Sequence, residues 1–410
     1  MKRELAIVSG DVAWILTSAA FVMIMTPGLA FFYGGMVRGK NILSVLMHCF
    51  VIMLLISLEW VLWGYSLAYA PGGGFIGGFQ FLGLRGVGAE PSLIYATTVP
   101  QNAFMIYQAM FAIITPALIA GAFAERLKIN TFIVFTLLWA TFVYNPVAHW
   151  VWASGGWLRS LGVLDFAGGT VVHITAGAAA LASMFAIRKR SGFGSITMEP
   201  NNIPYVILGT ALLWFGWFGF NAGSALTAGG SAANAFVVTN TAAAAAGLTW
   251  MLMSWYFRGR PSVLGSMAGA VAGLVAITPA SGFVGPLAAI AIGIGAGVFC
   301  YLAVLLRNRK NLDDSLDVWG VHGIGGTWGA IATGIFAEAA VGGTNGLLFG
   351  NPAQLVTQLI GVAATWAYAF TLTFVILKVL DVTMGLTVKP EEEEVGLDIS
   401  QHGERANATS

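Results

Sequence analysis

The sequence contains few charged residues and only two cysteines. Asp, Glu, Lys and Arg make up 9% of the 410 residues, whereas ordinary soluble chains contain roughly 25%. The formal net charge is +1 and no basic patch is present, so nothing indicates binding to nucleic acid. Cys49 and Cys300 lack the spacing of a metal or redox motif and are interpreted as small buried hydrophobic residues. The composition therefore argues against soluble domains.

The chain contains many long apolar runs. Hydrophobic residues make up 57% of the chain, and runs near 20 residues are long enough to cross a bilayer as helices. We predict an all-α polytopic membrane protein, with eleven transmembrane helices in residues 1–386 and a solvated, partly disordered cytoplasmic tail in residues 387–410. The predicted spans are 11–36, 42–70, 101–124, 130–151, 167–188, 202–222, 234–257, 262–280, 283–306, 319–338 and 354–386.

The basic residues predict the orientation of these helices, because Lys and Arg are enriched in cytoplasmic loops. Loops after even-numbered spans contain only Arg85 and Arg159. The chain is therefore expected to begin outside the cell and to end inside it, although Lys2 and Arg3 oppose this orientation. The twelve basic residues in loops after odd-numbered spans are Arg38, Lys40, Arg126, Lys128, Arg188, Lys189, Arg190, Arg258, Arg260, Arg307, Arg309 and Lys310.

An acid and a histidine occur together in two apolar stretches, DFAGGTVVHITAG and DVWGVHGIGG. Asp165 precedes His173 by eight residues, and Asp317 precedes His322 by five. Ionisable groups at membrane depth are costly, so each marks a candidate functional site. The histidines fall in the fifth and tenth predicted spans, which predicts an inverted repeat of five plus five helices. The repeats would be residues 11–190 and 200–338, followed by the helix at 354–386.

A single histidine in a membrane helix is more often a packing group than a functional one, but equivalent places in two repeats favour function. Burial favours the uncharged imidazole, which has one donor and one acceptor, so two facing rings can share a proton. Two imidazoles without a third ligand do not indicate a metal site. His48 and His149 are interpreted as packing or interface groups, and His402 as part of the tail.

Three carboxylates lie in or beside the apolar runs. Asp165 and Asp317 are predicted to cap the helices that follow them, since a helix N-terminus favours an acid. Asp165 is also a candidate for holding a site electrostatically without touching the substrate. Glu59 lies inside a membrane run and stays unassigned.

Aromatic side chains and one hydroxyl gather near the expected outer face. Most membrane aromatics are packing groups or interface anchors, but rings with a hydroxyl can also form a cation–π cage for a small cation. Tyr107 and Phe111 are four residues apart and share a helix face. The other members of the set are Trp152, Trp217, Phe220 and Ser224.

Several long motifs occur in order along nearly the whole chain: FFYGGMVRGKN, GAFAER, NPVAHWVW, DFAGGTVVH, WFGFNAGS, ITPASG and DVWGVHG, with an LDxxxHGE-like tail. They closely resemble the ammonium transporter (Amt/Mep/Rh) family. The resemblance is nearer to the Amt branch than to the Rh branch, since Trp152 and Ser224 are both present. It implies a homotrimer with one pore per subunit, in the cytoplasmic membrane of a prokaryote. No cofactor and no enzymatic activity are expected.

The resemblance also implies a role for individual residues. Trp152, Phe111 and Ser224 match the external ammonium-binding site, and Tyr107 matches the aromatic residue beside it. Phe111 and Phe220 match the stacked pair that gates the pore. The positions implied to line the pore are His173, His322, Trp217 and Thr278. Asp165 matches the acid that supports the outer site from a distance.

The implied function is transport of ammonium or ammonia, with methylammonium as a further candidate substrate. Ammonium would bind outside, lose its proton, and cross as ammonia past the histidines; whether the proton crosses too is left open. A PII-type signal protein is the implied partner on the cytoplasmic face. The rival functions are an ammonium sensor and a neutral-gas channel of the Rh kind, and a cation cage at Trp152 and Ser224 argues against the channel. No nucleophile–base arrangement indicates an enzyme.

Overall fold

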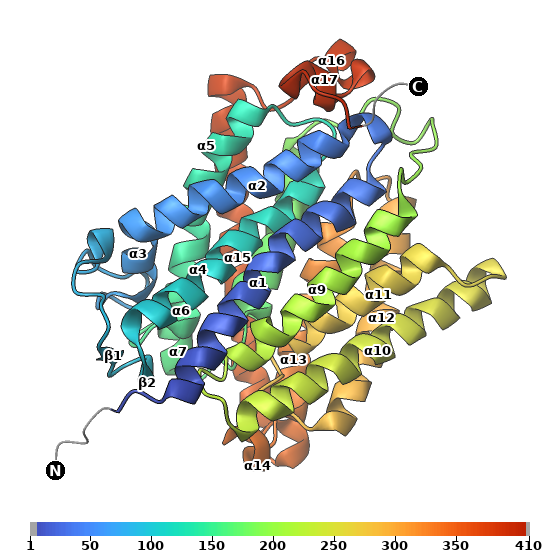
Figure 1. Ribbon diagram of the computed structural model, residues 1–410. Coiled ribbons are helices and arrows are strands. Elements are labelled where there is room, and N and C mark those ends of the chain that lie inside the picture. The colour runs from blue at the N-terminus through green and yellow to red at the C-terminus, as the bar shows by residue number, and fades with distance from the viewer. Residues whose placement is uncertain (1–5, 407–410) are drawn as a thin grey trace.

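The computed structural model describes residues 6–406. Its long helices lie side by side in one bundle (Figure 1). Within these residues, nine helical segments are long and apolar enough to cross a membrane, which confirms the predicted all-α polytopic class. Two shorter segments occupy the positions expected for the eighth and tenth spans. They are α11 (Val263–Ile277) and a turn, η6 (Trp319–Ile324), that continues into α13 (Gly325–Phe336).

Each predicted span ends within four residues of a helix boundary. The remaining spans correspond to α1 (Ser9–Met36), α2 (Ile42–Glu59) with α3 (Tyr65–Tyr69), α4 (Gln101–Phe123), α5 (Ile129–Trp139) with α6 (Asn145–Trp152), α8 (Thr175–Ala186), α9 (Ile203–Gly223), α10 (Gly230–Arg258), α12 (Pro286–Arg309) and α15 (Pro352–Met384). The shorter elements are η1 (Gly39–Asn41), η3 (Leu82–Leu84), α7 (Trp157–Leu161), α14 (Ala339–Gly342), η7 (Leu347–Phe349) and an antiparallel pair, β1 (Pro91–Ser92) and β2 (Ala96–Pro100).

Four of the spans contain a π-helical turn, in which each turn holds one residue more than in an α-helix. These are η2 (Trp60–Gly64), η4 (Ala140–Tyr144), η5 (Gly169–Ile174) and η6. Such turns occur frequently at functional sites, and η5 contains His173 while η6 contains His322. The apolar pattern of the sequence did not reveal them, because one extra residue in a uniformly apolar run leaves the pattern unchanged.

The two histidine-bearing helices cross at a pair of glycines. A Cβ atom on Gly177 would overlap the Cα atom of Gly323, and a Cβ atom on Gly326 would lie 2.9 Å from the Cβ atom of His173. Gly177 follows His173 by four residues, as Gly326 follows His322. Small residues at such crossings allow membrane helices to approach closely. The crossing therefore brings the two histidines together from distant parts of the chain.

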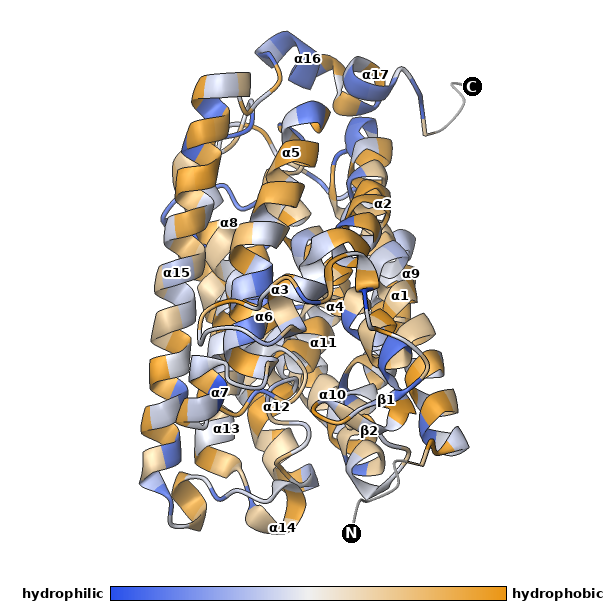
Figure 2. Ribbon diagram, turned by 90° about the vertical axis from the view of Figure 1, so that its left-hand side faces the viewer, coloured by the Kyte–Doolittle hydropathy of each residue, from blue (hydrophilic) through white to orange (hydrophobic). Residues whose placement is uncertain are grey.

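Polar residues are concentrated at one end of the bundle. Figure 2 shows the hydrophilic helices α16 (Pro390–Val395) and α17 (Leu397–His402) at the end opposite to the start of α1. The prediction of a partly disordered tail is therefore wrong for residues 387–406, which fold against the bundle. Residues 407–410 of the tail, and Lys2 and Arg3, lie outside the described residues.

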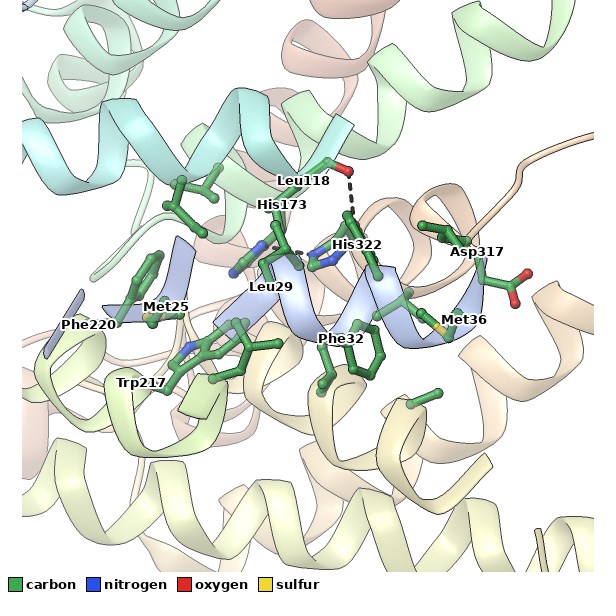
Figure 3. A pocket seen from close by; sticks show the side chains of 18 residues that line it. Met25, Leu29, Phe32, Met36, Leu118, His173, Trp217, Phe220, Asp317 and His322 are labelled. Atoms are coloured by element: carbon green, nitrogen blue, oxygen red, sulfur yellow. Dashed lines mark hydrogen bonds between the residues drawn. The ribbon is translucent and has the colours of Figure 1, made fainter. Parts of the chain in front are cut away.

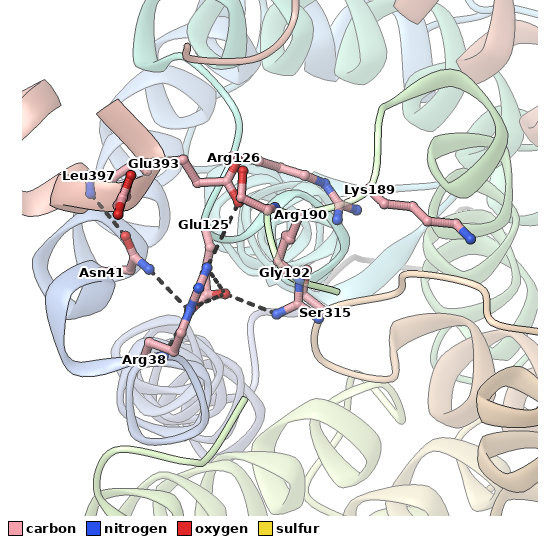
Figure 4. Close-up of polar contacts among 12 residues, drawn as sticks. Arg38, Asn41, Glu125, Arg126, Lys189, Arg190, Gly192, Ser315, Glu393 and Leu397 are labelled. Carbon is pink, nitrogen blue, oxygen red and sulfur yellow. Dashed lines mark hydrogen bonds and ion pairs between the residues drawn. The ribbon is translucent and has the colours of Figure 1, made fainter. Parts of the chain in front are cut away.

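Beneath these tail helices, buried acids and arginines form a continuous network (Figure 4). Glu125 lies 3.0 Å from a guanidinium nitrogen of Arg38 and 3.0 Å from one of Arg190. Asp313 contacts Arg126 and lies 2.7 Å from Arg190. Burial by itself raises the pKa of Glu125 and Asp313, but the arginines outweigh it and hold both pKa values below the usual range. The loops that carry these residues all follow odd-numbered spans. Because the residues contact one another, these loops lie together at one end of the bundle.

The tail attaches to this network through buried acids. Glu393, which is fully buried, lies 2.7 Å from Arg188 and accepts a hydrogen bond of 2.6 Å from the Ser191 backbone amide. Asp398 accepts one of 2.8 Å from the amide of Ser44. Acidic composition suggested a solvated tail, but these acids accept hydrogen bonds from the Ser191 loop and from the first turn of α2. The tail is ordered because its charges have partners.

We expect Glu393→Ala to release the tail. The substitution removes the acceptor of the Ser191 amide and the acid beside Arg188. Arg188 is partly exposed and keeps its bonds to Thr387 and Val388, so the expected cost is about 1–3 kcal/mol, that of leaving a buried donor unsatisfied. Limited trypsin digestion of the purified protein should remove the C-terminal segment faster than in the wild type, since cleavage follows the population of the open form. The matched control is Glu391→Ala, which changes an exposed acid on the same helix. Equal digestion rates for the two variants would contradict this account.

We expect Gly177→Ala to destabilise the bundle. The added methyl group would overlap Gly323, and such overpacking typically costs about 1–3 kcal/mol. Thermal unfolding in detergent should begin at a lower temperature than in the wild type. Gly10→Ala is the control, because a Cβ atom there meets nothing within 4 Å. That change should be neutral or slightly stabilising, and the same result at Gly177 would show that the crossing is looser than described.

Candidate functional site

A cavity of about 400 Å³ opens at the end of the bundle away from α16 and α17, and we call it the outer cavity. It unites the three residues expected to form an external site: Trp152 from α6, Phe111 from α4 and Ser224 just after α9. The rings of Phe111 and Trp152 are 5.7 Å apart and nearly perpendicular. Two ring systems and a hydroxyl therefore border one space, as a cation–π site requires.

Tyr107 does not line the outer cavity but lies fully buried behind it. Its hydroxyl lies 2.9 Å from the carbonyl oxygens of Gly219 and Phe220, and 3.2 Å from the Ser224 hydroxyl. The Ser224 hydroxyl in turn donates to the carbonyl of Phe220 at 2.9 Å. Because the hydroxyl proton of Ser224 is donated to this carbonyl, its oxygen can act only as a hydrogen-bond acceptor toward a ligand. Tyr107 positions Ser224.

Asp165 lies at the edge of the outer cavity and is committed to the backbone. Its carboxylate accepts four amide hydrogen bonds of 2.7–3.1 Å, from residues 168–171 at the start of η5. The chain reaches these positions through Gly168, whose φ of 119° favours glycine. The carbonyl of Asp165 also accepts a 3.0 Å bond from the Trp152 indole. Asp165 therefore orients both the indole and the histidine-bearing helix.

Phe111 and Phe220 separate the outer cavity from a second one. Their ring centroids are 4.4 Å apart, and the rings are tilted by 46° rather than stacked in parallel. Phe111 lines only the outer cavity, and Phe220 lines only the second. The expected gate pair thus forms the partition between the two spaces.

The second cavity, which we call the histidine cavity, is narrow and mostly apolar, with a volume of about 30 Å³. That is room for one or two molecules of the size of water. Figure 3 shows Phe220 at one end, Asp317 at the other and the histidines between them. One wall is a face of α1 formed by Met25, Leu29, Phe32 and Met36.

His173 and His322 face each other across this cavity. Their Nδ1 atoms are 3.3 Å apart, so one ring donates a proton that the other accepts. The Nε2 atom of His173 has no partner among the described residues. The ring of His173 also stacks on Trp217 at 5.4 Å. The pair therefore presents a polar edge within an apolar passage.

Trp217 lines the histidine cavity, but Thr278 does not. The Thr278 hydroxyl accepts a 2.9 Å hydrogen bond from the Trp217 indole and donates one of 2.7 Å to the carbonyl of Leu274. Thr278 therefore acts on the cavity by holding Trp217 in place.

The acid that corresponds to Asp165 in the second half is Asp314 rather than Asp317. Asp314 precedes His322 by eight residues, the spacing between Asp165 and His173. Its carboxylate accepts a 2.7 Å bond from the amide of Trp319, at the start of η6. The capping role predicted for Asp317 thus falls to Asp314. Asp317 instead lies at the end of the histidine cavity, with Oδ1 2.9 Å from Nε of Arg307.

The other ionisable candidates lie away from both cavities. His48 stacks on Phe132 at 4.1 Å, and His149 lies 2.9 and 2.8 Å from two backbone carbonyls, as expected of packing groups. Glu59 accepts a 2.8 Å hydrogen bond from Asn145, next to two of the π-helical turns. Among residues 6–406, no group of His, Cys, Asp and Glu is arranged to hold a metal ion.

Sequence reasoning did not single out several residues that line the outer cavity. They are Tyr69, Tyr95, Phe104, Gln108 and Arg159. Gln108 carried a signal, since an amide inside an apolar span three residues from Phe111 shares its helix face. Tyr69 lies at the end of the predicted span 42–70, and Tyr95 lies between that span and the next one, so only the fold brings them to the cavity.

The profile of the Ammonium Transporter Family matches residues 13–407. Over 97% of its length the chain is 52% identical to ammonium transporter Amt1 of Archaeoglobus fulgidus, covering 99% of that protein. The crystal structure of Candida albicans Mep2 is similar with a TM-score of 0.91 and 40% identity, covering 99% of this chain and 92% of that one. A structure described as a sensor Amt protein has a TM-score of 0.89 and 30% identity, covering 96% and 98%. The chain therefore belongs to the ammonium transporter family.

Proposed function

We infer that this protein transports ammonium across the cell membrane, in which it is a multi-pass protein. The observation that carries the mechanism is the order of its parts: an aromatic cavity, a pair of phenylalanines, and a narrow passage containing two facing histidines. Ammonium would enter at Trp152, Phe111 and Ser224, and ammonia would cross past His173 and His322.

The outer cavity suits a small cation. Ring faces attract cations through their quadrupoles, by about 0.5–2 kcal/mol each depending on exposure. Ser224 lines the cavity and donates its hydroxyl proton to the Phe220 carbonyl, so its oxygen would add one hydrogen-bond acceptor. A neutral gas would need neither feature.

The histidine cavity favours the neutral form of the substrate. Moving a small ion from water into a medium of low dielectric constant has an idealised cost of about 20 kcal/mol. Ammonium holds its proton to about two pH units above neutrality, so removing it at pH 7 costs only about 3 kcal/mol. Potassium is of similar size and has no proton to lose. An apolar passage with polar imidazole edges would therefore conduct ammonia and reject potassium.

We further propose the membrane arrangement. Eleven spans, with the N-terminus outside and the C-terminus inside, agree with the cluster of basic loops beside the tail and with the start of α1 at the opposite end (Figure 2). Residues 11–190 and 200–338 would be inverted repeats, a relation supported by the shared spacing from Asp165 to His173 and from Asp314 to His322. The homotrimer rests on family resemblance.

Two rival functions remain as outcomes of the test. The first is an ammonium sensor, a role suggested by the similarity to a sensor Amt protein. The second is a neutral-gas channel, and the proposed cation site argues against it. We propose no enzymatic activity, since neither cavity holds a nucleophile beside a base.

We also propose a PII-type signal protein as a partner on the cytoplasmic face. The exposed surface of α16 and α17, and the basic loops around them, would form the contact. This partner rests on family resemblance.

An ammonium jump applied to proteoliposomes on a solid-supported membrane tests transport directly. We expect a saturable current for ammonium and none for potassium if the proton crosses with ammonia. Internal alkalinisation without current would mean that ammonia crosses alone. If neither signal arises, the protein does not transport and the sensor function takes its place.

The same assay tests the histidine passage. Replacing both His173 and His322 by Ala removes the polar edge and the shared proton, so ammonium transport should fall by an order of magnitude or more, or potassium should begin to permeate. His48→Ala is the control, because that histidine lies outside both cavities. Full ammonium transport that still excludes potassium in the double variant would refute the assignment of the passage.

For the proposed partner, we expect the tagged transporter to co-purify with a PII-type protein from cells shifted to high ammonium. The Glu393→Ala variant should recover less of it if the docked tail forms the contact surface. Wild-type preparations that contain no PII-type protein would count against the interaction.

A further inference from the structure

Glu59 is a buried acid that the proposed transport route does not use. Only 1% of the residue is exposed, it borders neither cavity, and it takes part in none of the ion pairs among residues 6–406. A carboxyl group at membrane depth is costly and marks a candidate functional group. Its Oε1 atom accepts a hydrogen bond of 2.8 Å from the Asn145 amide. Glu59 is therefore expected to act through Asn145.

The bond to Asn145 connects two of the π-helical turns. Glu59 directly precedes η2, and Asn145 directly follows η4. A second bond joins the same two turns, donated by the Trp63 indole of η2 to the Thr141 hydroxyl of η4 at 3.0 Å. The carboxyl group of Glu59 lies against η2 itself, because a Cβ atom on Gly64 would overlap its Oε2 atom. The two turns are therefore linked to each other by buried hydrogen bonds.

The helices that follow these turns form part of the wall of the outer cavity. α3 begins after η2 and ends at Tyr69, α6 begins after η4 and ends at Trp152, and both of these end residues border the cavity. Asn145 and Trp152 are seven residues apart, which is about two helical turns, so they lie on the same face of α6. The rotation of α6 about its axis therefore determines where the Trp152 ring points.

A π-helical turn sets the rotation of the helix that comes after it. One residue corresponds to about 100° of rotation and about 1.5 Å of rise along an α-helix, so a shift of η4 by one residue would turn Trp152 away from the cavity. Turns of this kind are rare and need support from their surroundings. The bonds from η2 give that support, since breaking either one leaves a buried donor of Asn145 or Trp63 without an acceptor.

We propose that Glu59 is a positioning residue of the outer cavity: by accepting the hydrogen bond from Asn145, it fixes the rotation of α6 and directs the Trp152 ring toward the entering ion. The inference rests on the proposed transport function and deepens it. Glu59 serves the recognition of ammonium and not its passage, since the two histidines lie in other helical segments. The role requires an acceptor oxygen rather than a negative charge.

The test compares the rate of ammonium transport against ammonium concentration in Glu59→Leu, Glu59→Gln and wild-type proteoliposomes. Glu59→Leu removes the acceptor and should raise the KM by about 10-fold, because the apparent affinity falls with the fraction of molecules in the competent rotation. The maximal rate should stay close to that of the wild type, whereas a loss of folded protein would lower it. Glu59→Gln keeps an acceptor oxygen and should retain the wild-type KM.

Thr136→Val is the matched control, because it removes a buried hydroxyl of α5 that has no partner among residues 6–406. It should leave the KM unchanged. In a Trp152→Leu background, Glu59→Leu should raise the KM no further, because its effect depends on that ring. An additional rise in this background, or an unchanged KM in Glu59→Leu alone, would overturn the proposal while leaving transport intact.

If thermal unfolding in detergent shows that Glu59→Leu does not fold, the nearly isosteric Thr141→Val takes its place. This change removes the second bond between η2 and η4 and should also raise the KM at an unchanged maximal rate. An unchanged KM in Thr141→Val would then overturn the proposal. If the wild type gives neither current nor alkalinisation, the transport function itself fails, and this inference fails with it.

Discussion

The close crossing of the two histidine-bearing helices is the constraint on which the rest of the structure depends. Gly177 and Gly323 allow the backbones to touch, and the crossing sets the Nδ1 atoms of His173 and His322 3.3 Å apart. Imidazoles inside a membrane protein are costly unless their polar atoms have partners. Here each ring supplies the partner of the other, and the remaining polar edge faces the passage. A larger side chain at the crossing would separate the rings and break the hydrogen bond between the two imidazoles.

The same principle governs the acids at the starts of these helices. Asp165 satisfies the backbone amides that begin η5, and Asp314 bonds the amide of Trp319 in η6. The first backbone amides of a helix have no partner within the helix. A carboxylate at that position accepts their hydrogen bonds, and these bonds stabilise its negative charge. Asp165 also receives the Trp152 indole on its carbonyl. Trp152, at the proposed cation site, and the helix that carries His173 are therefore both anchored by Asp165.

In the proposed function, the two cavities would divide recognition of the ion from conduction of ammonia. The outer cavity is roomy, aromatic and polar at several points, whereas the histidine cavity is narrow and mostly apolar. The Phe111–Phe220 contact separates them, so under the proposed function an ion would bind on the outer side and be excluded from the apolar inner side. At the end of the bundle beside α16 and α17, a network of arginines and acids connects the loops after the odd-numbered spans with the tail. This network holds the helix ends in a fixed arrangement around the inner end of the passage.

The sequence by itself determined the membrane class, the spans to within four residues, and those cavity residues that belong to its motifs, such as Phe111, Trp152, His173 and His322, because span length and motif identity are local properties of the chain. Only the tertiary structure decided what depends on helix rotation and crossing. The π-helical turns that carry the histidines, the capping by Asp314 rather than Asp317, and the place of Thr278 behind Trp217 belong to this group. So does the docking of the tail by Glu393. The contacts of Thr278 and Glu393 join distant segments, and no spacing along the chain records which segments those are. The π-helical turns and the Asp314 cap are local, but an apolar run and two nearby acids do not show which backbone bonds will form.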